Sequence, residues 1–338
     1  MRIMRIWPAL TLGAVAAVVA ASPGPAVAAP AACKKATDIE AIIDDSGSMS
    51  LSDSGRLRVQ AMNLLMQALD GSTTLGAIEF GSTFDPAMQP AAEPVFAPAA
   101  VGPNAAAMKT ALDTKIQADA GSTDYNAAFT AGRAANPDAQ ARIFLTDGGH
   151  NMGAYSDAHL NPPPQAQTPT YVIGFGSGLA GSADQARLQK IADDTGGRYF
   201  PLPDNTALQS VMNEISTALT CQSPPQTFSD ALGQGRSKVH SVRLTKKAKA
   251  AQIALSWANP LDKFKITGLR VVRGHKVVAT AARKRHLTVK VRKGATFTVV
   301  KVSRLVKGKL RFAVKATRIG SGAPKVTLTT QVSQALRR

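Results

Sequence analysis

The first two thirds of the chain alternate short apolar runs with segments of helical periodicity. The apolar runs end at Gly, Asp or Ser, and apolar residues recur three and four positions apart in the segments between them. Strands that alternate with helices predict a doubly wound, mostly parallel sheet with helices on both faces. We predict strands over 37–43, 74–80, 142–146, 170–175 and 197–200, and helices over 56–69, 104–116, 124–135, 184–194 and 205–219.

Two segments of this half are less regular. A proline-rich passage over 81–103 permits at most an irregular edge strand, because proline cannot donate to a β-ladder. Asn104 then follows, and its side chain is of a type that commonly caps helices. We therefore expect the helix over 104–116 to begin at Asn104.

From Gly235 onward apolar residues alternate with Lys, Arg or Thr in short runs that are separated by glycines. This pattern predicts an antiparallel β-sandwich over 236–332, in which each sheet has one face in water. A Pro-Pro pair at 224–225 separates the two patterns, so residues 222–235 are predicted to form a linker. The sequence thus predicts an α/β domain over 36–221 followed by a smaller all-β domain.

The amino terminus has the order of a secretory signal. Arg2 and Arg5 precede an apolar stretch over 6–21, and small residues up to Ala28 follow a short Pro-containing segment. We predict a signal peptide over 1–28. An uncleaved membrane anchor is the alternative, but the apolar run is short and is broken by prolines. No later stretch is apolar enough to span a bilayer, so the mature chain is expected to be secreted or held at the cell surface.

The chain contains two cysteines, Cys33 and Cys221. Export permits a disulfide, and an even number of cysteines suits one. The two positions bracket the predicted α/β domain, so a bond between them would join its two ends. Two unrelated buried thiols are the alternative.

Charge divides the chain at the predicted linker. Residues 1–225 hold 13 basic and 20 acidic residues, whereas residues 226–338 hold 27 basic and 2 acidic residues, so the net charges are −7 and +25. The second half is expected to associate with an anionic envelope polymer, an acidic polysaccharide or anionic lipid. Nucleic acid is the poorest candidate, since no aromatic residues interleave with the basic clusters. Alternatively, Lys and Arg simply occupy outward strand positions and protect the sheet edges.

Oxygen-bearing side chains gather where two predicted strands end. Asp44, Ser46 and Ser48 alternate after the strand over 37–43, and Asp147 follows the strand over 142–146. Ligands of open α/β sheets bind at the carboxyl ends of the strands, and oxygen ligands suit a hard cation such as Mg²⁺. Taken alone, the Asp-x-Ser-x-Ser run also fits an ordinary turn.

The order of four motifs resembles the von Willebrand factor type A domain over about residues 36–221. The motifs are Asp44-Asp45-Ser46-Gly47-Ser48-Met49, Gly121-Ser122-Thr123, Leu145-Thr146-Asp147-Gly148-Gly149, and the segment 191–200. The resemblance implies a metal-ion-dependent adhesion site for Mg²⁺, with Mn²⁺ or Ca²⁺ as alternatives. Its five ligands would be Asp44, Ser46, Ser48, Thr123 and Asp147. A carboxylate of a protein partner would complete the coordination shell.

Two other functions remain open at this point. His150 lies three residues after Asp147 and could act as the general base of a metal-assisted hydrolase, but no second His, Glu or Cys has a fitting spacing. A structural surface protein with a purely stabilising metal is the other alternative. Asp45 is expected to support the turn, and Asp124 to complement the start of the helix over 124–135. The sequence favours a non-enzymatic, metal-dependent binding protein.

Overall fold

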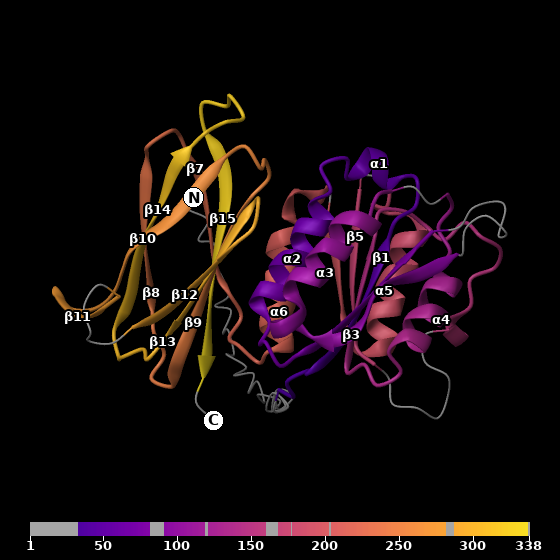
Figure 1. Ribbon diagram of the computed structural model, residues 1–338, viewed down its shortest axis with the longest axis horizontal. Coiled ribbons are helices and arrows are strands. Elements are labelled where there is room, and N and C mark those ends of the chain that lie inside the picture. Colours follow the sequence, from indigo (N-terminus) through magenta and orange to yellow (C-terminus); the bar gives the residue numbers. More distant parts are fainter. Residues whose placement is uncertain are drawn as a thin grey trace, which may run out of the picture. The chain divides into compact units, whose positions relative to one another are not determined.

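The computed structural model describes residues 33–81, 91–118, 121–159, 168–176, 178–202, 204–281 and 287–336. The predicted signal peptide over 1–28 lies outside these residues. Residues Lys34–Arg338 form one compact unit. Within it, an α/β domain is followed by two antiparallel sheets, as the sequence predicts (Figure 1).

The α/β domain is built on a six-stranded sheet of order β3-β2-β1-β4-β5-β6. All neighbouring strands are parallel except β3, which runs antiparallel to β2 at the edge with two register shifts. The strands are β1 (Asp38–Asp44), β2 (Thr74–Phe80), β3 (Ala92–Ala100), β4 (Ala141–Thr146), β5 (Thr170–Phe175) and β6 (Arg198–Leu202). The prediction of a mostly parallel sheet with an irregular proline-rich edge is confirmed.

Helices cover both faces of this sheet: α2, α3 and α6 pack on one face, and α4 and α5 on the other (Figure 1). The helices are α1 (Met49–Ser52), α2 (Leu57–Ala68), α3 (Val101–Lys115), α4 (Tyr125–Ala135), α5 (Ala183–Thr195) and α6 (Leu208–Leu219), with 3-10 turns at Asp157–His159 and Asn205–Ala207. On β1, Ile43 packs on the first face and Ile42 on the second. None of the described helices is both long and apolar enough to cross a membrane.

The predicted start of α3 at Asn104 is wrong. The helix begins at Val101, and the side-chain amide of Asn104 donates to the carbonyl of Ala100 (2.8 Å) from within the first turn. Pro103 is compatible with this earlier start, because backbone N–H groups of the first helical turn have no intrahelical partner to lose.

The second domain is a β-sandwich of two antiparallel sheets, β11-β10-β14-β8 and β12-β13-β9-β15-β7. Its strands are β7 (Gln226–Leu232), β8 (Ser237–Arg243), β9 (Ala248–Trp257), β10 (Lys263–Arg273), β11 (Lys276–Thr280), β12 (Thr288–Lys293), β13 (Phe297–Ser303), β14 (Lys309–Arg318) and β15 (Val326–Leu336). Side chains from both sheets, among them Phe312 and Ile253, fill one core.

Part of the predicted linker over 222–235 is a strand instead. Gln226–Leu232 form β7, which pairs with β15 along its whole length. Its polar composition gives no strand pattern in the sequence. In the structure Asp230 pairs with His240 on β8 (2.7 Å), and the ring of Phe228 lies against that histidine. The contacts that hold β7 in place are therefore made with β15 and β8, and the sequence of β7 alone does not predict them.

Cys33 and Cys221 are disulfide-bonded, which confirms the predicted pairing. A backbone hydrogen bond joins the same two regions, since the amide of Ala36 donates to the carbonyl of Leu219 (2.9 Å). The beginning of the α/β domain is thus fastened to the end of its last helix.

Side chains of α2 and α6 contact the five-stranded sheet. Asn213 of α6 donates to Gln331 on β15 and accepts from Gln252 on β9, both at 3.0 Å. Leu64 of α2 is buried with Phe297 and Val299 of β13. Buried polar pairs and a small apolar cluster thus join these helices to the sheet.

Glu40 is a fully buried carboxyl in the middle of β1. A Cβ atom at Gly76 on the neighbouring β2 would lie 2.1 Å from a Glu40 carboxyl oxygen, so Gly76 leaves the space that this side chain fills. Burial raises the pKa of Glu40 to about 8, although Asn136 and Arg142 favour the charged form. Glu40 is therefore protonated at neutral pH in the folded protein.

We expect Glu40→Gln to remove a pH dependence of stability. Between about pH 4.5 and pH 8 the unfolded chain releases the Glu40 proton while the folded protein keeps it, so the free energy of unfolding falls as pH rises. The variant should match the wild type near pH 5 and exceed it by about 2–4 kcal/mol near pH 8. Urea unfolding at both pH values measures this, with Glu214→Gln on α6 as control. If the free energy of unfolding changed with pH by the same amount in Glu40→Gln and in the wild type, Glu40 would not be the protonated group.

Candidate metal centre

Three loops meet at the carboxyl edge of the six-stranded sheet. Because β1 and β4 are adjacent and parallel, Asp44 at the end of β1 and Asp147 directly after β4 lie at the same edge. Thr123 stands two residues before Tyr125, where α4 begins. The loop after β1 is fastened to the loop before α4, since the amide of Gly47 donates to the carbonyl of Gly121 (3.0 Å).

Hydrogen bonds link four of the five predicted metal ligands. Ser48 Oγ donates to Asp147 Oδ1 (2.7 Å) and lies 3.2 Å from Ser46 Oγ. The Oδ1 atom of Asp44 accepts from the backbone amide of Ser46 (2.9 Å), and its Oδ2 atom accepts from Thr146 Oγ1 (2.6 Å). The carboxylates and serines therefore form one connected cluster.

The fifth predicted ligand, Thr123, borders the same point. A Cβ atom on Gly148 would lie 3.7 Å from Thr123 Oγ1 and 3.8 Å from Ser48 Oγ, so the two hydroxyls flank the space that the missing side chain leaves open. The structure thus brings together all five side chains that the sequence singles out.

Electrostatics make this cluster suitable for a cation. Asp44 is fully buried, and burial together with the nearby charge of Asp147 raises its pKa to about 7, although hydrogen bonds from Ser46 and Thr146 oppose the shift. Neither carboxylate has an ion-pair partner within the described part of the chain. Two carboxylates and three hydroxyls are hard oxygen donors, the set that Mg²⁺ or Ca²⁺ prefers. The residues fit the predicted cation.

Hydroxyl donors are essential to this fit. Over the described residues, no three His, Cys, Asp or Glu side chains gather in a group that could hold a metal ion. A cation at the cluster would therefore depend on Ser46, Ser48 and Thr123 as well as on the two aspartates.

Three further residues support the cluster and were not predicted. Ser52 in α1 donates to Asp147 Oδ2, Thr146 donates to Asp44, and the side chain of Asn151 accepts from the amide of Thr123 (2.8 Å). Ser52 follows Ser48 by four residues, which is helical spacing, so a short helix after Ser48 is the signal that could have found it. Asn151 carries no comparable signal.

Asp45 faces away from this cluster, into a buried ion triad. Its carboxylate accepts from Arg58 Nη2 (2.8 Å), and Arg58 Nη1 donates to Asp53 (2.9 Å). The backbone amides of Gln117 and Ala118 also donate to Asp45 (3.0 and 2.8 Å). The triad therefore fastens the loop after β1 to α2 and to the end of α3, as expected of a residue that supports the turn.

His150 is held inside the loop after β4. Its Nδ1 accepts from the backbone amide of Tyr125 (3.1 Å), and its ring packs beside the rings of Tyr125 and Tyr155. Burial lowers the pKa of His150. Asp124, beside it, caps α4 by accepting from the amide of Ala127 (3.0 Å), as the sequence predicts. This arrangement gives the hydrolase alternative no support, because one ring nitrogen is already bonded and the ring is enclosed.

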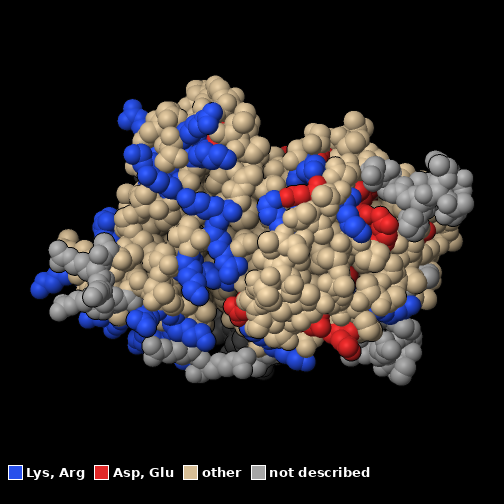
Figure 2. Space-filling model, in the orientation of Figure 1, with Lys and Arg blue, Asp and Glu red and all other residues tan. Residues whose placement is uncertain are grey.

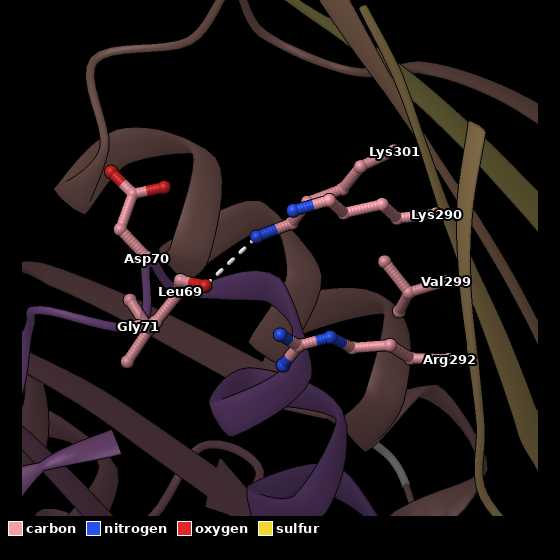
Figure 3. Close-up of a pocket in the computed structure, with 7 residues that line it drawn as sticks. All are labelled: Leu69, Asp70, Gly71, Lys290, Arg292, Val299 and Lys301. Atoms are coloured by element: carbon pink, nitrogen blue, oxygen red, sulfur yellow. Dashed lines mark hydrogen bonds between the residues drawn. The ribbon is translucent and has the colours of Figure 1, made fainter. Parts of the chain in front are cut away.

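Apart from this cluster, a pocket with a volume of about 150 Å³ lies at the carboxyl end of α2 (Figure 3). Its lining residues are Leu69, Asp70, Gly71, Lys290, Arg292, Val299 and Lys301. Lys301 Nζ donates to the carbonyl of Leu69 (2.8 Å), and Arg292 donates to Gln67 (2.9 Å). Cations near the last carbonyls of a helix stabilise its end. Lys301 and Arg292 of this pocket are thus engaged by the end of α2.

Comparison with known proteins agrees with the motifs. The family model described as "von Willebrand factor type A domain" matches residues 38–214. No curated protein matches the chain. A von Willebrand factor type A structure from Catenulispora acidiphila is 15% identical, with a TM-score of 0.43, and the match covers 89% of this chain and 64% of that one. The pilus adhesin SpaC from Lactobacillus rhamnosus GG is 13% identical, with a TM-score of 0.41 and coverages of 90% and 45%. The chain spans less than two thirds of each.

Proposed function

Because the chain belongs to the von Willebrand factor type A family, we propose that it is an exported, non-enzymatic binding protein with a cation-dependent site. Domains of this family typically act in adhesion and protein binding. The observation that carries the proposal is the cluster at the ends of β1 and β4, in which three hydroxyls meet two carboxylates that have no ion-pair partner among the described residues. Mg²⁺, or Mn²⁺ or Ca²⁺ in its place, would be held by Asp44, Ser46, Ser48, Thr123 and Asp147.

The ligand of this site would be an acidic group on a protein partner. Neutral hydroxyls supply three of the five donors, so a bound divalent cation would keep the ability to attract a further carboxylate. Ser48 is exposed and Asp147 is half-buried, so the cluster is open to a partner. Next to it Leu51 in α1 is 88% exposed, and this apolar side chain offers a contact beside the charged one.

The β-sandwich would hold the protein at an anionic envelope surface. Lys and Arg gather over the sandwich, whereas most of the Asp and Glu side chains in the same view lie over the α/β domain (Figure 2). A domain with 27 basic and 2 acidic residues attracts polyanions from solution. One domain would thus bind the partner protein while the other keeps the molecule near the cell surface.

We expect a partner to be retained only in the presence of the cation. The full chain without residues 1–28 is immobilised and exposed to solubilised surface proteins from the cells that produce it. Proteins retained in Mg²⁺ should be released by EDTA, and Asp147→Ala should retain less than a tenth of the wild-type amount. Asp138→Ala, which removes an exposed carboxylate elsewhere in the same domain, serves as the control. Equal retention by Asp147→Ala and Asp138→Ala would refute the proposed site.

A further inference from the structure

The outer face of the four-stranded sheet β11-β10-β14-β8 carries cations in opposed pairs. Along β14, Leu310, Phe312 and Val314 are buried in the sandwich core. The residues between them therefore point outward, because successive side chains of a strand lie on opposite faces. The register sets Lys315 opposite Lys265, Arg311 opposite Arg270, and Lys309 opposite Arg243. We call these six residues the basic face.

Fold stability does not explain this arrangement. Like charges directly opposite on paired strands are destabilising, because their Cβ atoms lie only about 5 Å apart. None of the six cations forms an ion pair in the described part of the chain. The two acids that follow residue 225 are engaged elsewhere: Asp230 pairs with His240, and Asp262 is fully buried and accepts from the amide of Ser321 (2.9 Å). An external anion is the partner that would relieve the repulsion.

The geometry of the pairs favours phosphate over carboxylate. Each pair presents two cations from neighbouring strands, and a tetrahedral phosphate can direct different oxygens toward both. A carboxylate has only two oxygens, both in one plane, and Arg binds carboxylate and phosphate alike in bidentate fashion. The contrast therefore lies in the directions that the oxygens of a phosphate offer to two cations on different strands. Along β14, the Lys309 and Arg311 rows are about 7 Å apart and the Arg311 and Lys315 rows about 14 Å apart, because Ala313 lies between the last two. Both spacings are multiples of one repeat, so a polymer with regularly repeated charges can engage the three rows together.

The face lacks the groups that would recognise nucleobases. The large exposed apolar side chains among the described residues are Leu and Val, with no aromatic residue among them. Binding of single-stranded nucleic acid relies on aromatic side chains on which the bases stack. The ligand chemistry is therefore that of a phosphate polymer without bases.

We propose that the basic face is a binding site for a linear phosphate polymer that carries no nucleobases. The inference rests on the proposed anchoring of the sandwich to an anionic surface, and it names the sheet face and the ligand class. The first strand pair to engage would be β10 and β14, which hold two of the three cation pairs between them.

The test measures how salt weakens the binding of linear polyphosphate to the full chain without residues 1–28, in EDTA so that the metal centre plays no part. Lys265→Gln/Lys315→Gln removes one opposed pair of exposed lysines. We expect it to weaken binding at low salt at least tenfold and to reduce the slope of log K against log salt by about 1.4, since each lost phosphate contact removes about 0.7. The control Lys293→Gln/Lys325→Gln removes two exposed lysines outside the face and should leave the slope unchanged. Equal effects of the two double variants would overturn the assignment of the face.

Three further measurements separate the possible failures. Polygalacturonate, a carboxylate polymer, should bind at least tenfold more weakly than polyphosphate. If both polymers bound equally and both depended on Lys265 and Lys315, the proposed anchoring to an anionic surface would be supported, but the ligand would not be specifically a phosphate polymer. If neither polymer bound, both the proposed anchoring and the phosphate ligand would be wrong.

Single-stranded DNA with an equal number of phosphates should bind no more tightly than polyphosphate, and tighter binding would make the ligand a nucleic acid. In the absence of polymer, Lys265→Gln/Lys315→Gln should unfold at the same or a higher temperature than the wild type, and a lower one would make the pair structural.

Discussion

Arg58→Met is expected to lower the free energy of unfolding by about 3–5 kcal/mol. The guanidinium of Arg58 is fully buried and bridges Asp45 and Asp53, which are themselves buried. Removing the only positive member of this triad leaves two carboxylates out of water, and methionine fills the space without neutralising them. Urea unfolding of the variant and the wild type at the same pH measures the loss.

Two comparison variants show whether charge is the cause. Arg58→Met/Asp45→Asn/Asp53→Asn should recover a large part of the loss, because no uncompensated charge then remains buried. Arg187→Met, which breaks a half-exposed pair with Asp184, should change stability by at most about 1 kcal/mol. If Arg58→Met lowered the free energy of unfolding by less than about 1 kcal/mol, the ion triad would not be a main source of stability for the loop after β1 and its packing on α2.

Asp44→Asn is expected to abolish the stabilisation of the protein by divalent cations. For the wild type, Mg²⁺ at a hundred times its dissociation constant should add about 2.7 kcal/mol to the free energy of unfolding. The variant should gain nothing, because it lacks a buried carboxylate of the cluster. Thermal unfolding with EDTA and with Mg²⁺ measures both changes, and Asp138→Asn serves as the control.

In EDTA the same variant should be more stable than the wild type by about 1–2 kcal/mol, or about 2–4 °C in unfolding temperature. The reason is that Asp44 is buried beside Asp147, and among the described residues no cationic side chain pairs with either carboxylate. A variant that kept the wild-type response to Mg²⁺ would show that Asp44 is not a ligand.

The ends of the strands made the cluster of oxygen-bearing side chains predictable from the sequence. A buried strand that ends at Asp44, and a second that ends next to Asp147, must share an edge if the sheet is parallel and the strands are close. The supporting contacts could not be predicted in this way. Asn151 reaches the amide of Thr123 only because of the path of the loop after β4, and the sequence does not encode that path in a pattern.

In the sandwich, too, the sequence pattern predicts strands but not which strands pair. Alternating residues predicted most of its strands, but the pairs of the basic face depend on β14 lying between β8 and β10, which are distant from it in sequence. A shift of register by one residue would reverse the face on which each side chain lies. Strand β7 was missed because its polar residues resemble a linker, and its pairing with β15 is visible only in three dimensions.

Calorimetric titration of the full chain without residues 1–28 with Mg²⁺, repeated with Mn²⁺ and Ca²⁺, measures directly whether the protein binds a divalent cation. We predict one bound cation per chain for the wild type and for Asp138→Ala, and at least a hundredfold weaker binding for Asp147→Ala. The absence of binding by the wild type, or equal binding by Asp147→Ala and Asp138→Ala, would contradict a cation site at the ends of β1 and β4.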